Sequence, residues 1–442
     1  MELTQRIMKA IDTAPVVDCH EHIPPERERL AREWDIFSLL FLAYIDADLL
    51  SAGASQATVD RVIQGDESVS EKWRIIKAPW SRARRTGYGR TIEIALDRFF
   101  GEKDFARGGA ERADERLREW NTPGVYTRVL RDACGIRTSI NQRIDGLEPG
   151  EEHLFTLSIK TVGRGAIDRR EVEAEEARAG KRLSTLDDFL AHIRSVVKTA
   201  HANGAVALKT AAWHLGQPDP GAPEIASYLF GLDEHPPQKG PPLTQAEAAY
   251  TRVMRAAPGY ATLEDHRLLC NVYMHYLAEL AGELGMTVAV HCGPGWRSWI
   301  DYRLFRVEHI MPLLRAHPDT RFDIYHAGLP WPRELAMTLK LCPNAWVDLT
   351  WAHIIAPEMT VSFLDELLDM LPSNKVIGFG GDVHFAPEIA YGHLVIAREN
   401  IARALARRVE RGRLNEEDAV DMARAFLYDN PVQAYQLNNV GA

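Results

Sequence analysis

From about residue 184 to the C-terminus, short apolar runs alternate with amphipathic helical segments, and this alternation constrains the fold more than any other feature. The helical segments are bounded by capping and breaking residues, as at Thr185 and Gly204. Such alternation is typical of βαβ units, which build a parallel sheet. The expected strands in this part of the chain are 205–213, 287–290, 321–325, 345–349 and 376–379.

Three runs nearer the N-terminus, at 16–17, 139–144 and 154–162, bring the expected strands to eight and predict a (β/α)8 TIM barrel of the α/β class. The chain has 442 residues, which is long for a plain barrel. We therefore expect one barrel domain over 1–442 that carries two additions. Residues 24–135 predict a helical insertion over the barrel mouth, and the proline-rich residues 214–261 predict a lid-like excursion.

The sequence Asp18-Cys19-His20-Glu21-His22 ends the first apolar run. Side chains alternate along an extended strand, so His20 and His22 point the same way and are able to share one metal ion. An isolated His-x-His pair is a weak signal, because exposed strands carry such pairs by accident. Its position at the end of the first barrel strand makes it a candidate metal site.

Four more residues of suitable chemistry lie at or just after later strands: Lys209, His291, His326 and Asp382. The carboxyl ends of the strands of a parallel barrel meet at one face, where active sites of such barrels lie. Neutral imidazole and carboxylate suit zinc, manganese or iron(II). Each residue alone is more often structural, and the prediction of a divalent metal site depends on their joint placement.

Charge, cysteine content and apolar runs limit the kinds of partner that the protein is expected to have. The formal net charge is −10 and is spread along the chain, which argues against nucleic acid or an anionic membrane as a main partner. The five cysteines are scattered and predict no disulfide framework. The N-terminus lacks a signal-peptide layout and the longest apolar run, 37–45, is too short for a bilayer. We expect a cytoplasmic protein with a small-molecule substrate, and its size is compatible with a homo-oligomer.

The chain resembles the amidohydrolase superfamily of metal-dependent (β/α)8-barrel enzymes. The segments that carry the resemblance are 17–23, 288–291, 324–328 and 380–382, together with the C-terminal Leu427-Tyr428-Asp429-Asn430-Pro431 and Tyr435. Within the superfamily, the helical insertion with Trp73, Trp80 and Tyr88-Gly89-Arg90 is similar to that of the uronate isomerases.

The resemblance implies roles for the clustered residues. His20, His22 and Asp382 would bind the metal, with His291 as a further ligand, and zinc is favoured over manganese or iron(II). Asp382 would act as general base and then general acid, while His326 would polarise a substrate carbonyl or hold an oxyanion.

Lys209 has three alternative roles. A carboxylated Lys209 would bridge two metal ions, a protonated one would bind a substrate carboxylate, and a third alternative is a salt bridge at the barrel rim. We expect one ion per chain, and two only if Lys209 is carboxylated.

Four residues are candidates for substrate binding: Arg297, Trp351, His353 and His384. For Arg297 the alternative is a solvated loop residue, and for the other three it is packing under loops. The leading hypothesis is a metal-dependent hydrolase that cleaves a C–N or C–O bond (amide, ester or lactone type) of a small polar carboxylate. The alternatives are a decarboxylase or a uronate-isomerase-like sugar-acid isomerase on the same site, and, last, a metal-bound protein without activity.

Overall fold

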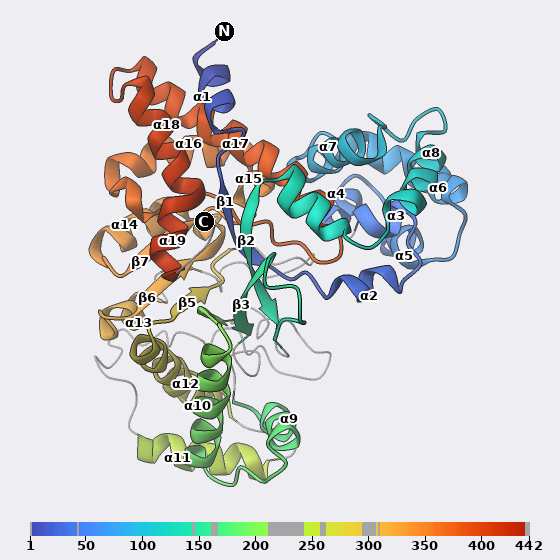
Figure 1. Cartoon of the computed structure of the whole chain (residues 1–442). Coiled ribbons are helices and arrows are strands. Elements are labelled where there is room, and N and C mark those ends of the chain that lie inside the picture. The colour runs from blue at the N-terminus through green and yellow to red at the C-terminus, as the bar shows by residue number, and fades with distance from the viewer. Residues whose placement is uncertain are drawn as a thin grey trace.

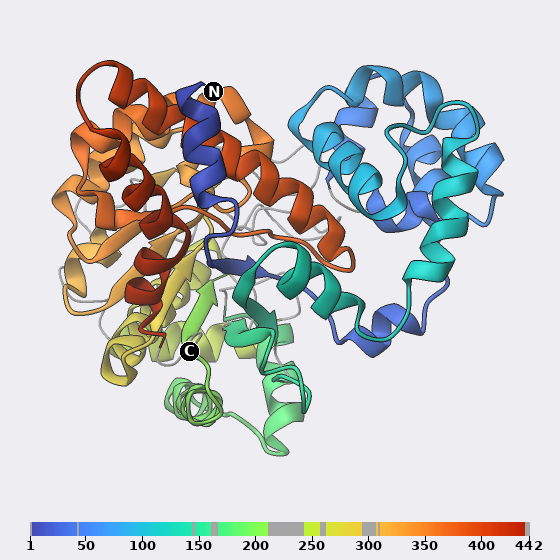
Figure 2. The same ribbon diagram turned by 45° about the horizontal axis from the view of Figure 1, so that its top comes forward.

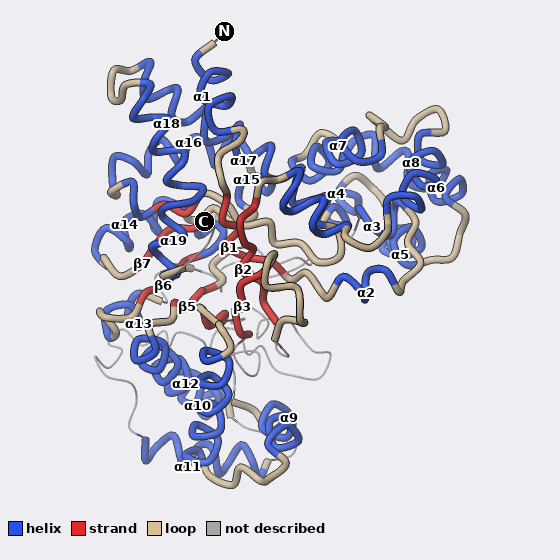
Figure 3. The backbone as a smooth tube through the Cα atoms, viewed as in Figure 1, coloured by secondary structure: helices blue, strands red, loops and turns tan. Residues whose placement is uncertain are grey.

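Eight parallel strands form one sheet in chain order, seen as the red segments in Figure 3. The computed structural model describes residues 2–41, 44–143, 146–160, 167–210, 243–256, 262–293, 306–307 and 310–437. The strands are β1 (Val16–Glu21), β2 (Ile136–Arg143), β3 (Phe155–Lys160), β4 (Ala207–Thr210), β5 (Thr287–Val290), β6 (Arg321–Ile324), β7 (Ala345–Asp348) and β8 (Val376–Ile377).

Backbone hydrogen bonds between β1 and the segment after β8 nearly close the sheet into a barrel. The Cys19 amide donates to the Phe379 carbonyl at 3.1 Å, and the Asp382 amide donates to the His20 carbonyl at 2.8 Å. The His22 amide donates to the Val383 carbonyl at 3.0 Å. The predicted TIM-barrel fold is therefore confirmed, and its closure uses the two segments that carry His-x-His and Asp382.

The strand bounds differ from the expected ones at both ends of the sheet. β1 continues through Glu21, although only 16–17 is apolar, because the polar side chains that follow are buried inside the barrel. β2 begins three residues before 139, where Ile136 pairs with Val16. β8 ends at Ile377, since the amide of Gly378 turns away to donate to the Phe426 carbonyl at 2.8 Å.

Helices cover the outside of the barrel between the strands. Thr185 begins one of them with a capping box, because its hydroxyl accepts from the Asp188 amide and the Asp188 carboxylate accepts from the Thr185 amide. The helices that follow β3 are α9 (Arg169–Ala179), α10 (Leu186–Ala202), α11 (Leu243–Arg255), α12 (Leu263–Leu284), α13 (Met311–Ala316), α14 (Pro332–Leu341), α15 (Ala352–Ile355), α16 (Pro357–Met370), α17 (Pro387–Glu410), α18 (Glu416–Arg424) and α19 (Asn430–Tyr435). The N-terminal helix α1 (Leu3–Ile11) packs on α17 and α18.

Residues 24–135 are largely helical and stand to one side of the barrel, where Figures 1 and 2 show them in blue to teal. Their helices are α2 (Glu26–Leu30), α3 (Ile36–Leu40), α4 (Ile45–Ser51), α5 (Gln56–Gln64), α6 (Val69–Ala83), α7 (Gly87–Phe100), α8 (Gly109–Trp120) and the π-helical segment Thr127–Ala133. An aromatic cluster of Phe37, Phe41, Trp80 and Phe105 fills the centre of this part.

The insertion is joined to the barrel where α7 packs on α17. A Cβ on Gly392 would lie 2.4 Å from the Thr91 carbonyl oxygen, so only glycine permits this close approach of the two helices. Of the expected excursion over 214–261, only α11 and Ala256 belong to the described part of the chain. Within that part, no helix combines the length and the apolarity that crossing a bilayer requires.

Candidate metal centre

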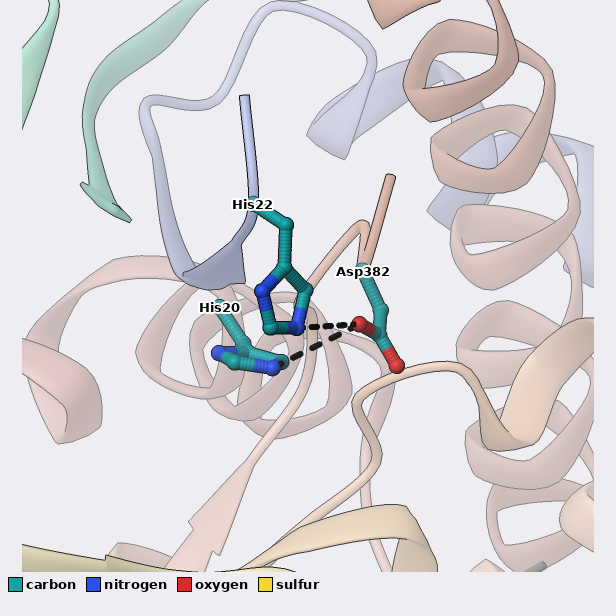
Figure 4. Close-up of side chains that lie close together, drawn as sticks. All are labelled: His20, His22 and Asp382. Carbon is teal, nitrogen blue, oxygen red and sulfur yellow. Dashed lines mark ion pairs between the residues drawn. The ribbon is translucent and has the colours of Figure 1, made fainter. Parts of the chain in front are cut away.

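His20, His22 and Asp382 converge at the carboxyl end of the barrel (Figure 4). The Nε2 atoms of His20 and His22 lie 3.4 Å and 3.3 Å from the same oxygen of Asp382, Oδ1. One ligand atom from each residue falls within 4.8 Å of the others. This spacing lets a single cation contact all three side chains.

Local structure explains the convergence. Alternation along β1 points His20 and His22 to the same side, and the hydrogen bond from the Asp382 amide to the His20 carbonyl fixes Asp382 beside them. Asp382 has a φ of 55°, in the left-handed region. Two glycines precede it, and a Cβ on Gly381 would lie only 2.0 Å from Glu21 Oε1. The Gly-Gly pair thus lets the loop after β8 lie flat against β1.

Two buried acids of β1 hold that loop. Asp18 Oδ1 accepts from the Gly381 amide at 3.0 Å, and Glu21 Oε2 accepts from the Val383 amide at 2.7 Å. Burial raises the pKa of Asp18 to about 6 and raises the pKa of Glu21 well above its ordinary value. These acids were not among the predicted site residues, although their alternation with the histidines is visible in the sequence.

The charge states of the three residues suit a divalent cation. Burial lowers the pKa of His20 well below its ordinary value, so its imidazole is neutral and keeps a lone pair for a metal. Burial works to raise the pKa of Asp382, but the neighbouring His20 and His22 outweigh it and hold that pKa well below its usual range. Two imidazole nitrogens and one carboxylate are a donor set that fits zinc, manganese or iron(II).

His291 and His326 lie beside each other, and the metal-ligand role of His291 stays a prediction. His291 Nδ1 lies 2.9 Å from His326 Nε2, and His291 Nε2 lies 3.1 Å from the Gly293 carbonyl oxygen. His326 also lies 3.0 Å from the Thr350 carbonyl oxygen through Nδ1 and is completely buried. His291 lines the cavity described below, whereas His326 is outside its lining.

Lys209 ends β4, is buried, and lines the same cavity. Its ammonium lies 4.8 Å from the centre of the Tyr325 ring and 3.4 Å from the Thr210 carbonyl oxygen. The bridging, substrate-binding and salt-bridge roles of Lys209 therefore stay predictions, as does the expectation of one ion.

The predicted substrate-binding residues divide into three groups. Trp351 and His384 line the cavity, and the His384 ring stacks on His22 with 4.9 Å between ring centres. The His353 ring is fully buried, its Nε2 lies 2.9 Å from the Gly378 carbonyl oxygen, and it is outside the lining. This position fits the alternative of packing under a loop, and a substrate-binding role for His353 stays a prediction. The residue packs beneath the loop because a buried imidazole satisfies a backbone carbonyl there. Arg297 lies outside the described residues.

A cavity of about 1380 Å³ extends from the metal centre to the helical insertion. Its barrel side is formed by residues of β1, β2 and β4 and of the segments that follow β1, β5, β7 and β8, and its other side by residues of the insertion. The insertion residues that matter below are Arg32, Trp34, Asp35, Tyr44, Lys72 and Arg118. Sequence reasoning missed all of them, because no fixed spacing marks a residue that reaches a site from an insertion.

Tyr44 illustrates the difficulty. It lies inside the apolar run 37–45 and has the appearance of a core residue. Its hydroxyl donates to the Asp382 carbonyl at 3.0 Å, and its ring contacts Trp351 with 4.1 Å between centres. Tyr44 therefore ties the insertion to the loop that carries Asp382.

A family model described as amidohydrolase matches residues 188–437, which is more than half of the chain. The chain belongs to the amidohydrolase family. The cluster of His20, His22 and Asp382 is the candidate metal site of this family member.

Individual relatives agree with this family. The chain is 26% identical over 196 residues to a uronate isomerase of Cutibacterium acnes (40% of this chain, 42% of that protein). It is 26% identical over 131 residues to the protein fluG of Emericella nidulans (29% of this chain, 15% of that protein). The chain thus spans less than half the length of these two curated relatives.

Likeness of fold to a solved structure extends over nearly the whole chain. The solved uronate isomerase of Thermotoga maritima superposes with a TM-score of 0.76 at 16% identity, covering 98% of this chain and 97% of that one. A match of this extent includes the helical insertion as well as the barrel, and at this identity it is a likeness of fold.

Proposed function

We propose that this protein is a metal-dependent isomerase that interconverts the aldose and ketose forms of an open-chain sugar acid. The observation that carries the proposal is the large cavity over the metal centre, walled on one side by the helical insertion. A polyhydroxylated chain needs many polar contacts along its length, and this cavity offers imidazole, amide, carboxylate and cationic groups. The likeness to uronate isomerases over both barrel and insertion supports the same activity.

The metal ion is proposed to be zinc, held by His20, His22 and Asp382. When bound, a divalent cation supplies charge that polarises a carbonyl oxygen and the adjacent hydroxyl. His291 and Lys209 line the cavity next to this centre and are placed to orient the hydroxyls of the substrate. Tyr44 holds Asp382 through its backbone carbonyl, which limits the movement of the carboxylate.

The isomerisation is an internal proton transfer. The carbon beside the carbonyl loses a proton, the carbonyl carbon gains one, and the hydroxyl proton moves to the former carbonyl oxygen, so no co-reactant is needed. Asp382 directs Oδ1 at the two histidines, and Figure 4 shows its other oxygen pointing away from them. We assign the proton transfer between the two carbons to that second oxygen.

A product assay tests the proposal. Metal-loaded protein is incubated with D-glucuronate and D-galacturonate, and the products are followed by NMR and mass spectrometry. The proposal predicts a ketose of unchanged mass and incorporation of deuterium at carbon from D₂O. Absence of any isomer in both reactions, with metal retained by the protein, would falsify it.

Hydrolysis of a C–N or C–O bond remains the second candidate, because the family model is that of an amidohydrolase. It requires a group that stabilises the oxyanion, and the predicted one, His326, is buried with both ring nitrogens beside partners. That arrangement favours isomerisation. In the same assay hydrolysis gives products whose combined mass exceeds that of the substrate by one water.

A further inference from the structure

Arg32 lies in the segment between α2 and α3 and lines the cavity. Its hydrogen-bonding partners differ from those of Lys72 and Arg118, two other cations of the lining. The guanidinium of Arg32 makes no hydrogen bond or ion pair with any described residue. By contrast, the Lys72 ammonium lies 2.6 Å from Asp35 Oδ2, and Arg118 Nη2 lies 2.5 Å from Asp114 Oδ2. Arg32 is therefore a cavity cation whose N–H donors remain available to a ligand.

Two aromatic rings hold the Arg32 guanidinium. Its central carbon lies 4.8 Å from the centre of the Trp34 ring and 4.7 Å from the centre of the Phe385 ring. The two rings themselves are 5.1 Å apart. Contact with aromatic faces restrains the guanidinium plane while leaving its edge, where the N–H groups lie, open to hydrogen bonding.

Arg29 holds both residues of this aromatic clamp, Trp34 and Phe385, through hydrogen bonds. The Trp34 indole N–H donates to the Arg29 carbonyl at 2.9 Å, and Arg29 Nη1 donates to the Phe385 carbonyl at 3.1 Å. Arg29 is itself held by two hydrogen bonds to Glu388, 2.8 Å and 2.7 Å long, in a fully buried ion pair. The position of Arg32 is thus set by a rigid anchor that joins the insertion to the barrel.

The aromatic clamp is also close to the metal centre in the sequence. Phe385 is three residues after Asp382, and the intervening His384 stacks on His22. Arg32, Trp34 and Phe385 thus line the same cavity as the three residues of the metal centre.

From this geometry we infer that Arg32 binds the substrate's carboxylate and selects sugar acids over neutral sugars. A planar guanidinium matches a carboxylate through two parallel N–H···O bonds, which a lysine ammonium is unable to reproduce. The inference rests on the proposed function, and it names the residue that would give that function its preference for acids.

The test measures binding of two probes that do not isomerise. D-Gluconate carries a carboxylate, whereas D-glucitol has the same carbon chain with an alcohol in its place. Calorimetric titrations of metal-loaded wild type, Arg32→Gln and Arg32→Lys are compared. Arg74→Gln is the matched control, because Arg74 is exposed, pairs with Glu71 at 2.6 Å, and lies outside the cavity lining.

Wild type and Arg74→Gln are expected to prefer gluconate over glucitol at least tenfold. Arg32→Gln should weaken gluconate binding by about tenfold to a hundredfold and leave glucitol unchanged. Arg32→Lys should fall between them, since it keeps the charge and loses the two-point contact. Equal gluconate affinity in wild type and Arg32→Gln overturns the inference, as does a wild type that fails to prefer gluconate.

The two proposals fail separately. If hexuronates are not isomerised but the gluconate preference depends on Arg32, the proposed function is wrong and the carboxylate site stands. If hexuronates are isomerised and Arg32→Gln keeps the wild-type kcat/KM, the isomerase stands and the assignment of Arg32 is wrong.

Discussion

Replacing Arg29 by methionine should lower the free energy of unfolding more than replacing a surface residue does, because Arg29 joins the insertion to the barrel. Both side chains of the Arg29–Glu388 pair are fully buried, and Arg29 also donates to Asn121 Oδ1 at 3.0 Å. Burial works to raise the pKa of the Glu388 carboxyl, and Arg29 outweighs it and holds that pKa below its ordinary value. Arg29→Met leaves this carboxylate buried without its cation.

Removal of one partner from a buried ion pair costs about 3–5 kcal/mol. Urea unfolding followed by tryptophan fluorescence measures the loss in free energy of unfolding. The double variant Arg29→Met with Glu388→Gln should lose about 0.5–3 kcal/mol less free energy of unfolding than the two single variants added together. The reason is that the double variant keeps no buried charge without a partner.

The control is Arg333→Met. Arg333 pairs with Glu366 at 2.6 Å, but its side chain is 75% exposed, so its loss should cost less than about 1 kcal/mol. A loss in Arg29→Met no larger than that of Arg333→Met would refute the idea that this pair anchors the insertion.

Three further outcomes are expected. Asp382→Asn should lower kcat by about 10²–10⁴-fold while part of the metal is retained, as measured by turnover and elemental analysis together. Burial lowers the pKa of His353 to about 4 and of His393 to about 3, from 6.5. Each therefore stabilises the fold fully above pH 6.5 and loses about 1.4 kcal/mol per pH unit below it, until the folded-state pKa is reached, which urea unfolding at pH 5 and pH 7 will detect. Gly381→Ala should weaken metal binding in equilibrium dialysis, because the added Cβ meets an atom 2.0 Å away, whereas Gly412→Ala has nothing within 4 Å and should bind metal as wild type does.

The barrel was predictable because its signals are local and repeated. Most strands contain a short apolar run and several helices begin at a capping residue such as Thr185 or Thr262, so spacing predicts the order of these elements. β1 was the exception, since Asp18 and Glu21 are polar residues in a fully buried strand. Their burial depends on the amides of Gly381 and Val383, more than 360 positions away, which no local pattern reveals.

The candidate site likewise contains residues that the sequence predicts and residues that it does not. His20, His22 and Asp382 were found because strand ends in a barrel converge. The sequence left two roles open for His353, because a histidine after a strand has the same sequence signature whether it faces the cavity or packs beneath it. Arg32 and Tyr44 were missed because they reach the cavity from the insertion, whose position beside the barrel is set by contacts such as the Arg29–Glu388 pair.

We propose that one divalent cation is bound by His20, His22 and Asp382, which come from the two ends of the chain. Elemental analysis of purified protein, after dialysis against zinc and then metal-free buffer, tests it most directly. We predict about one ion per chain in wild type and less than about a tenth of that in the His20→Ala, His22→Ala double variant. An equal metal content in the two proteins, or none in either, would show that these side chains do not bind the ion.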